Sequence, residues 1–321
     1  MLLACSAAAT AFGVPDVVNQ VSQDSYRCYL DDQLYTHLGD SRGYYGAQHD
    51  AAQTNILNFF QTFGLAASLD PFYYSGRQFD NVVGVHWGAT RPDDIYVVGA
   101  HFDSAETPGA DDNGSGVAGV LEAARVLSSY DFQATLVFIA FDMEERGLLG
   151  SGAYAAEHAG DNIEGMVSLD MIAYNPDRSD RAWVYGRTAS DPIKNSLAQA
   201  ASLYGGLHPS IGGDVPYSDQ ASFEAYGFQA SLLIEYSVWS NPYYHKAADS
   251  VDTPNYIDYL YATKMTRATV GYLAGAAGLV PEPGSLTALG SGLVCLVVLV
   301  RRRRVQCGSA GASPCHRVLG S

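Results

Sequence analysis

The chain has 321 residues, 47% of them hydrophobic and 16% charged, which is enough for one large domain with a substantial core. The formal net charge is −16, and residues 1–300 hold 13 basic and 34 acidic side chains, so that part carries 13 − 34 = −21. A body this acidic repels nucleic acid and anionic membrane surfaces, so we exclude a nucleic-acid-binding protein.

The first residues, MLLACSAAATAFG, are small and apolar, and ATA resembles a signal-peptidase site. They lack a basic region and the apolar stretch is short. We therefore interpret residues 1–14 as the remnant of a secretory signal, with an irregular N-terminal coil as the alternative. One domain without repeats or long linkers is expected to follow, over residues 15–279.

Within this domain, apolar runs typical of buried strands alternate with segments of helical periodicity. The predicted strands are 81–89, 93–103, 134–145, 166–174 and 230–236, and the predicted helices are 51–65, 116–130, 150–159 and 261–279. Near-continuous apolar strands between helices indicate a sheet that is covered on both faces. The sequence predicts a single α/β domain with a mixed, largely parallel twisted sheet and helices on both faces.

Three of the predicted strands end in acidic side chains, and ligands of open α/β sheets gather beyond the carboxyl ends of strands. The first strand ends HFD, the second FDMEE and the third SLDM, and YYHKAADS adds a second histidine later in the chain. Taken singly, each cluster has a structural alternative, since Asp111 and Asp112 also suit a helix N-cap. Taken together, two histidines and several carboxylates without a thiolate favour zinc or a similar divalent ion.

The neighbouring acids Glu144 and Glu145 suggest two different roles in one site. Consecutive residues at a strand end point in opposite directions, so we expect one to bind metal and the other to face the substrate. A water between two cations becomes a nucleophile near neutral pH, and a free carboxylate can accept its proton.

The segments HFDS, GADDNGSG, EERGLLGS, LDM and YHKAADS also have the order and spacing of a known family. Over about residues 40–275 the chain resembles the secreted co-catalytic di-zinc aminopeptidases of the bacterial leucyl aminopeptidase type, which are relatives of glutamate carboxypeptidase II and glutaminyl cyclase. The resemblance implies a fold of the zinc exopeptidase type. It also implies a metal-dependent hydrolase that removes N-terminal residues from peptides or proteins.

The resemblance implies two zinc ions, although other divalent metals suit the same ligands. His101 and Asp170 would hold one ion, Glu145 and His245 would hold the other, and Asp112 would bridge them. Asp112 is preferred to its neighbour because the bridging acid of the family opens a D-x-x-S-G stretch, here DNGSG. Relatives have a cis peptide after that acid, so we expect one here.

Catalytic roles follow from the same resemblance. Glu144 would be the general base that deprotonates the water bridged by the two zinc ions, and later the proton donor. Asp103 would orient the imidazole of His101, as metal-bound histidines usually require. Tyr244 would help to stabilise the oxyanion. We further expect Tyr217, Phe223 and residues 236–244 to shape a pocket for an apolar side chain.

Two other functions remain open at this point. One is a glutaminyl cyclase-like or carboxypeptidase-type enzyme on the same fold, and cyclases of this type work with a single zinc. The other is a non-catalytic cell-surface binding protein, which predicts lost ligands, whereas all five ligands and the base are present.

The C-terminal part, residues 280–304, combines a Pro-Glu-Pro motif, the charge-free stretch 285–300 and the arginine cluster 301–304. This order resembles the bacterial PEP-CTERM sorting signal, which an exosortase processes during export. It implies an exported protein, periplasmic, cell-surface or extracellular, held transiently by a C-terminal transmembrane anchor. Residues 305–321 would form a cytoplasmic or disordered tail. A short hydrophobic helix packed on the domain is the alternative for 285–300.

Overall fold

The computed structural model describes residues 12–281, and a single eight-stranded sheet runs through them. The strand order is β1-β2-β4-β3-β5-β8-β6-β7. The strands are β1 (Ala66–Tyr74), β2 (Arg77–His86), β3 (Arg91–His101), β4 (Ala134–Phe141), β5 (Ile163–Asp170), β6 (Arg181–Tyr185), β7 (His208–Ile211) and β8 (Ala230–Glu235). The predicted mixed α/β sheet is therefore confirmed.

The centre of the sheet is parallel and its flanks are not. Strands β4, β3, β5 and β8 run parallel to one another, while β2 is antiparallel to β1 and β4, and β6 is antiparallel to β8. Every residue of β4 and β8 is buried, as expected for strands covered on both faces.

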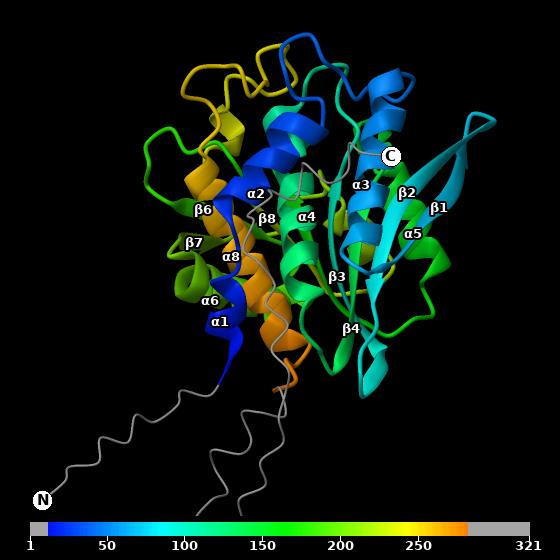
Figure 1. Ribbon diagram of the computed structural model, residues 1–321, viewed down its shortest axis with the longest axis vertical. Helices are drawn as coiled ribbons and strands as arrows, with labels where there is room; N and C mark the ends of the chain where they lie inside the picture. The colour runs from blue at the N-terminus through cyan, green and yellow to red at the C-terminus, as the bar shows by residue number, and fades with distance from the viewer. Residues whose placement is uncertain (1–11, 282–321) are drawn as a thin grey trace, which may run out of the picture.

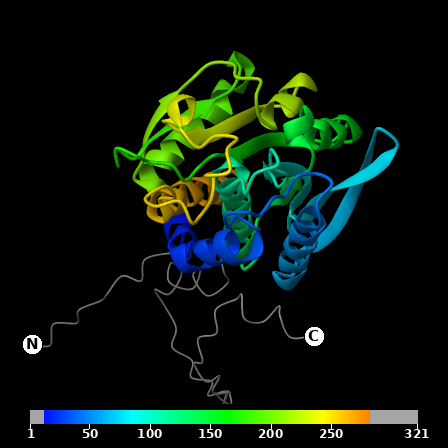
Figure 2. The same cartoon turned by 90° about the horizontal axis from the view of Figure 1, so that it is seen from above.

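Helices cover both faces of the sheet (Figures 1 and 2). One face carries α3, α4, α6 and α8, with α1 and α2 packed on α4 and α8, and the other face carries α5 and α7. Their bounds are α1 (Val14–Val18), α2 (Gln23–Cys28), α3 (Ala47–Thr62), α4 (Gly116–Leu127), α5 (Leu149–Glu157), α6 (Asp191–Ala200), α7 (Gln220–Ala225) and α8 (Tyr259–Ala276). The larger apolar core lies beneath α4 and α8.

The strand register brings the carboxyl ends of the three central strands to one edge. His101, the last residue of β3, pairs with Phe141, the last residue of β4. Gly99 pairs with Ser168 in β5, so Asp170 lies at the same level as His101 two residues further along both strands. The segments that follow β3, β4 and β5 therefore meet at a single place.

The two ends of the described chain lie against the body of the domain. Helix α1 packs against α8, and Leu279 forms an isolated β-bridge with Phe132. The backbone N–H of Val280 donates to the carbonyl of Asp131. The predicted anchor at 285–300, the arginine cluster and the tail lie outside the described residues. Among residues 12–281, no helix is both long and apolar enough to cross a membrane.

Candidate metal centre

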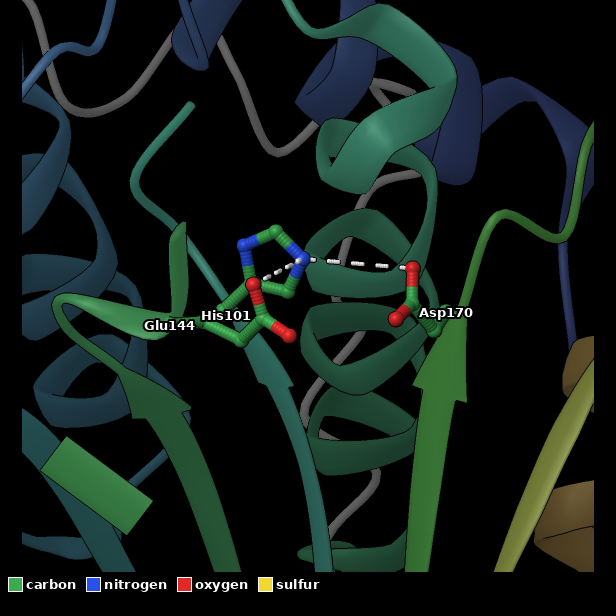
Figure 3. A group of neighbouring side chains, drawn as sticks. All are labelled: His101, Glu144 and Asp170. Carbon is green, nitrogen blue, oxygen red and sulfur yellow. Dashed lines mark ion pairs between the residues drawn. The ribbon is translucent and has the colours of Figure 1, made fainter. Parts of the chain in front are cut away.

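Two groups of potential metal ligands meet at the carboxyl edge of the central strands. His101, Glu144 and Asp170 form one group, in which one ligand atom from each residue lies within 4.8 Å of the others (Figure 3). Asp112, Glu145 and His245 form the second group by the same measure. All five predicted ligands and the predicted base are thus brought together from five separate segments.

The carboxylate of Asp112 lies between the two histidines. Its Oδ1 is 3.4 Å from Nε2 of His101, and its Oδ2 is 3.1 Å from Nε2 of His245. Each histidine also has a second carboxylate neighbour: Asp170 Oδ1 is 3.9 Å from His101 Nε2, and Glu145 Oε2 is 3.1 Å from His245 Nε2. One carboxylate therefore faces both ligand groups, each oxygen toward a different histidine.

The oxygens of this centre fit a divalent cation. Oδ2 of Asp112, Oε1 of Glu145 and Oδ1 of Asp170 are buried and accept no hydrogen bond from the described residues. Buried polar atoms are normally paired, and an unpaired carboxylate oxygen is costly. Carboxylate and imidazole are also ligands that zinc accepts.

Glu144 and Glu145 do not diverge in the way that strand alternation predicts. Strand β4 ends at Phe141, and both glutamates lie on a 3₁₀ turn, Glu144–Arg146, that follows it. Both side chains consequently face the centre. Oε2 of Glu144 lies 3.9 Å from His101 Nε2, whereas Glu145 contacts His245.

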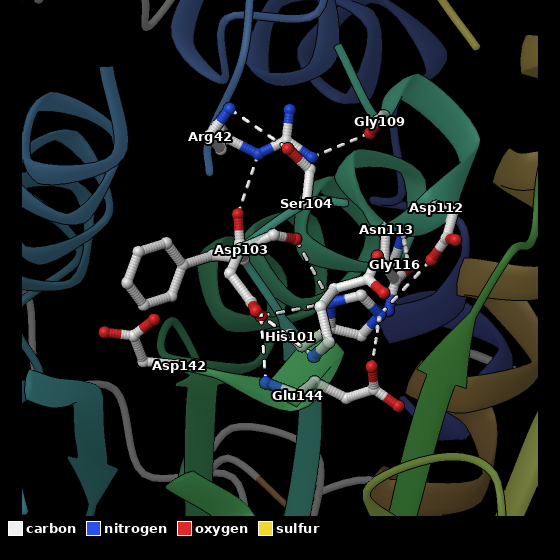
Figure 4. A network of polar contacts seen from close by, with 12 residues as sticks. Arg42, His101, Asp103, Ser104, Gly109, Asp112, Asn113, Gly116, Asp142 and Glu144 are labelled. Atoms are coloured by element: carbon white, nitrogen blue, oxygen red, sulfur yellow. Dashed lines mark hydrogen bonds and ion pairs between the residues drawn. The ribbon is translucent and has the colours of Figure 1, made fainter. Parts of the chain in front are cut away.

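Asp103 connects this turn to His101 (Figure 4). Its Oδ1 and Oδ2 accept the backbone N–H groups of Glu144 and Glu145 at 3.1 and 3.2 Å. Nδ1 of His101 is 3.4 Å from Oδ1 of Asp103 and 3.2 Å from its backbone carbonyl. A single buried carboxylate thereby sets the positions of the imidazole and of both glutamates.

The histidines supply the positive charge of the metal-free centre. Contacts with Asp112 and Glu145 raise the pKa of His245 to about 10. Burial opposes the charged form of His101, but Glu144, Asp103 and the other surrounding carboxylates raise its pKa well above the usual value. Burial also acts to raise the pKa of Asp112, yet its contacts with the two histidines hold that pKa well below the usual range.

The carboxylates farther from the histidines behave in the opposite way. Burial, reinforced by the neighbouring Asp112, raises the pKa of Asp170 to about 8. Burial likewise raises the pKa of Glu144 well above its ordinary value, with Asp219 and Asp170 adding to the effect. The centre holds more carboxyl groups than its two histidines can neutralise, and a bound cation would favour the ionised form of each.

The backbone that presents Asp112 is held by a second carboxylate. Oδ1 and Oδ2 of Asp249 accept the N–H groups of Asp111 and Asp112 at 2.8 and 3.1 Å, and the hydroxyl of Tyr256 also donates to Asp249. The Asp112–Asn113 peptide is cis, as expected. Asp111 points away from the centre, where it accepts hydrogen bonds from the backbone of Ala173 and from the Asn241 amide.

Arg42 supports the same loops and was not predicted from the sequence. Its fully buried guanidinium donates to the backbone carbonyls of Leu34, Phe102, Pro108 and Gly109 at 2.6–2.9 Å (Figure 4). No carboxylate of the described residues pairs with it directly. In the SRGYY segment, Arg42 stands beside aromatic residues, and this local pattern does not indicate hydrogen bonds to backbone carbonyls elsewhere in the chain.

A cavity of about 650 Å³ opens beside the centre. The predicted Tyr217 lines it, as do Val238, Trp239, Asn241 and Tyr244 from the predicted segment. Its other apolar walls, which the sequence did not indicate, are Met171, Tyr185, Val215, Pro216, Leu232 and Ile234. The expectation for Phe223 is wrong, because this ring is fully buried in the core against Phe141 and Tyr154.

Tyr244 lies at the edge of both the cavity and the centre. Its ring stacks on that of His245 with 3.8 Å between ring centroids, and nearly half of the residue is exposed. Burial of the rest and the nearby Asp112 raise the pKa of Tyr244, so its hydroxyl keeps the proton. The side chain is therefore a potential hydrogen-bond donor to a molecule in the cavity.

Curated proteins with similar sequences include two aminopeptidases. Leucine aminopeptidase 1 of Ajellomyces capsulatus is 32% identical over 233 residues, which cover 65% of this chain and 60% of that protein. Aminopeptidase YwaD of Bacillus subtilis is 32% identical over 195 residues, which cover 56% of this chain and 41% of its own length. The chain thus spans only part of these relatives.

Solved structures with the same fold include Legionella pneumophila LapA aminopeptidase, with a TM-score of 0.72, 23% identity and coverage of 83% of this chain and 74% of that one. Porphyromonas gingivalis glutaminyl cyclase has a TM-score of 0.67, 22% identity and coverage of 80% and 99%. At these identities the likeness establishes the fold alone.

Two family models match the chain. The PEP-CTERM protein-sorting motif matches residues 279–304, most of which lie outside the described residues. The model of peptidase family M28 matches residues 81–270, more than half of the chain and the whole of the centre described above. The chain belongs to peptidase family M28.

Proposed function

We propose that this protein is an exported, zinc-dependent aminopeptidase that removes apolar N-terminal residues from peptides. The observation that carries the proposal is the carboxylate of Asp112, which faces a histidine on either side beside an apolar cavity. Membership of peptidase family M28 and the similarity to curated aminopeptidases support it.

The arrangement supports two zinc ions that share Asp112. His101 and Asp170 would complete the first site, and Glu145 and His245 the second. Glu144 belongs to the first group by distance. We nevertheless assign Glu144 as the base, because the remaining five residues already provide three protein ligands for each ion.

When bound, the two ions would supply a nucleophilic water near neutral pH and polarise the carbonyl of the scissile bond. Glu144 accepts the proton of that water and then transfers it to the departing amine. Its raised pKa suits a group that must both take and return a proton. Asp103 keeps Glu144 and His101 in place, and Tyr244 donates to the oxygen on which negative charge develops.

The cavity sets the preference for the first residue of the substrate. The apolar walls and the two ligand groups line the same cavity. When the first side chain of a peptide contacts the apolar walls, the backbone of that residue therefore lies near the ligand groups. The apolar walls suit a side chain such as that of leucine or phenylalanine, and the volume of about 650 Å³, which includes the space at the ligand groups, also holds part of the peptide backbone.

The match to the PEP-CTERM protein-sorting motif supports export of the catalytic domain. We propose periplasmic, cell-surface or extracellular localisation, a transient membrane anchor at 285–300, and an exosortase-type enzyme as the processing partner. An acidic body is compatible with residence outside the cytoplasm and with no role in binding nucleic acid.

A panel of aminoacyl chromophores, assayed together with metal analysis of the same sample, tests the proposal. We expect release of free amino acids, fastest for leucine- or phenylalanine-type substrates, with two zinc ions per chain in the active protein. A glutaminyl cyclase-like enzyme would instead cyclise N-terminal glutamine with one zinc. A binding protein would turn over neither substrate.

A further inference from the structure

Two arginines lie over aromatic rings on the side of the metal centre that carries the Glu144–Arg146 turn. Cζ of Arg146 is 4.3 Å from the centroid of Tyr44, and Cζ of Arg77 is 4.8 Å from that of Tyr45 and 4.9 Å from that of Phe79. The two tyrosine rings are themselves in contact, with centroids 4.1 Å apart. We call these five residues the arginine–tyrosine surface.

Both guanidinium groups are held in place but remain unsatisfied. Within residues 12–281, neither guanidinium group donates a hydrogen bond, and the side chains of Arg77 and Arg146 are 41% and 43% exposed. Each has only a long ion pair, 4.0 Å to Asp50 and 3.8 Å to Glu106. A guanidinium stacked on a ring keeps its N–H edge free for a carboxylate, and exposed ion pairs of this length contribute little.

The sheet order places this surface on one side of the metal centre and the apolar cavity on the other. Arg77 and Phe79 come from β2, and Arg146 follows Glu145 in the turn after β4. Gly147 and Leu148, next to that turn, line part of the cavity, whereas most of its apolar walls come from the end of β5, from β8 and β6, and from nearby loops. In the order β1-β2-β4-β3-β5-β8-β6-β7, the strands that supply His101 and Asp170 lie between them. In Figure 1 the β1–β2 hairpin accordingly stands on the side opposite β6.

A peptide bound with its first side chain in the cavity must therefore extend its next residues toward the arginine–tyrosine surface. An extended chain advances about 3.5 Å per residue, so the first two residues after the scissile bond reach the side of the turn that carries Arg146. This region places two arginines close together in a body where acids greatly outnumber bases, with 34 against 13 in residues 1–300.

We infer that the arginine–tyrosine surface binds a carboxylate located on the first or second residue after the scissile bond. That carboxylate is either an acidic side chain or the C-terminal carboxylate of a di- or tripeptide. The inference rests on the proposed function for the direction of the bound peptide. Charge-assisted pairing with arginine is stronger than a neutral hydrogen bond, and it would offset the repulsion that the acidic body imposes on such substrates.

The test measures equilibrium binding to the zinc-loaded, full-length Glu144→Gln protein, so it does not depend on turnover. Leu-Asp amide against Leu-Asn amide tests a side-chain carboxylate, and Leu-Asn against Leu-Asn amide tests a C-terminal one. In at least one pair we expect the peptide with the carboxylate to bind about tenfold more tightly. Equal affinities in both pairs would overturn the inference.

Three further substitutions, made in the Glu144→Gln protein, distinguish loss of carboxylate binding from general structural damage. Arg146→Glu should reduce the affinity ratio to one or below. Glu106→Gln should increase it several-fold, because it removes the carboxylate that competes for Arg146. Arg91→Gln alters an arginine of similar exposure, 44%, at the opposite end of the sheet and should leave the ratio unchanged.

An equal loss of affinity for both members of each pair in Arg146→Glu would indicate structural damage and contradict the inference. Hydrolysis of leucine p-nitroanilide by the wild-type protein tests the proposed function separately. If hydrolysis is absent while the affinity ratio persists, the aminopeptidase proposal fails and the carboxylate site stands. If hydrolysis occurs while the affinity ratios equal one, the aminopeptidase proposal stands and the carboxylate site fails.

Discussion

Glu144 and Glu145 are adjacent in the chain, yet the structure gives them different surroundings. Both line the cavity, but Oε2 of Glu145 lies 3.1 Å from Nε2 of His245, whereas Oε2 of Glu144 lies 3.9 Å from Nε2 of His101. A proton acceptor must reach both the water and the substrate, and a metal ligand must not be displaced by either. The contrast between these environments is therefore the basis for the roles that we propose.

Replacing Glu144 by Gln should abolish turnover without removing metal. The substitution retains the shape of the side chain but eliminates its capacity to accept a proton, so we expect kcat to fall at least about 10²–10⁴-fold. Metal content, measured on the same preparation, should remain that of the wild type. Near wild-type kcat would show that another group is the base.

Asp112→Ala should release metal, because its two oxygens face both histidines. Asp111→Ala is the matched control: its carboxylate accepts hydrogen bonds from Ala173 and Asn241, so we expect lower thermal stability with metal retained. Metal analysis after dialysis distinguishes the two. Retention of metal in Asp112→Ala, with its loss in Asp111→Ala, would move the shared ligand to Asp111.

Zinc affinity should weaken as the pH falls. Contacts with Asp112 and Glu145 raise the pKa of His245 to about 10, so in the metal-free protein this imidazole is protonated at pH 7, and the surrounding carboxylates raise the pKa of His101 in the same direction. Each must lose its proton to bind zinc. A competitive chelator titration between pH 6 and 8 should show affinity rising by up to about tenfold per pH unit for each proton released. An affinity independent of pH would contradict this.

The sequence was informative about the ligands and about Asp103, and not about the rest of the residues that support them. His101, Asp170 and the other ligands end apolar strands or stand in motifs of defined spacing, so their positions follow from local pattern. Arg42 and Asp249 act through backbone groups that lie far away in the chain, and no local signal marks such contacts. Phe223 was misplaced because an aromatic residue beside a motif suits a pocket and a core equally well.

At the scale of elements, β2 and the buried central strands were predictable, and the other flanking strands, β1, β6 and β7, were not. Strands β3, β4, β5 and β8 are near-continuous apolar runs. Strand β1 is mostly exposed, and β6 and β7 have only five and four residues, so none carries a strong apolar signal. The turn at Glu144–Arg146 was read as part of β4, because its acids directly follow the apolar run.

Arg42→Met should destabilise the loops that carry the centre. At least four buried carbonyls, from the segments before α3 and after β3, would lose their donor. We expect a loss of at least about 3 kcal/mol in urea unfolding, together with weaker zinc binding. Arg27→Met removes an exposed arginine and should change stability by less than about 0.5 kcal/mol. Equal stability of both variants would contradict this account of Arg42.

At the scale of the whole molecule, the catalytic domain should not need the C-terminal segment. The sheet, both helical layers and the metal centre lie within residues 12–281, and Val280 makes the last backbone contact with the body. A chain shortened after Pro281 should therefore be soluble and retain wild-type kcat and zinc content. Failure to fold or loss of activity would show that residues beyond 281 pack on the domain. Full-length protein found soluble in the cytoplasm would contradict export.

The central claim is that Asp112 is shared by two zinc ions in one catalytic centre. An anomalous difference map, recorded at the zinc absorption edge from crystals of the active zinc-loaded protein, tests it most directly. We predict two peaks, one between Asp112, His101 and Asp170 and the other between Asp112, Glu145 and His245. A single peak in fully active protein, or zinc bound away from Asp112, would contradict the account.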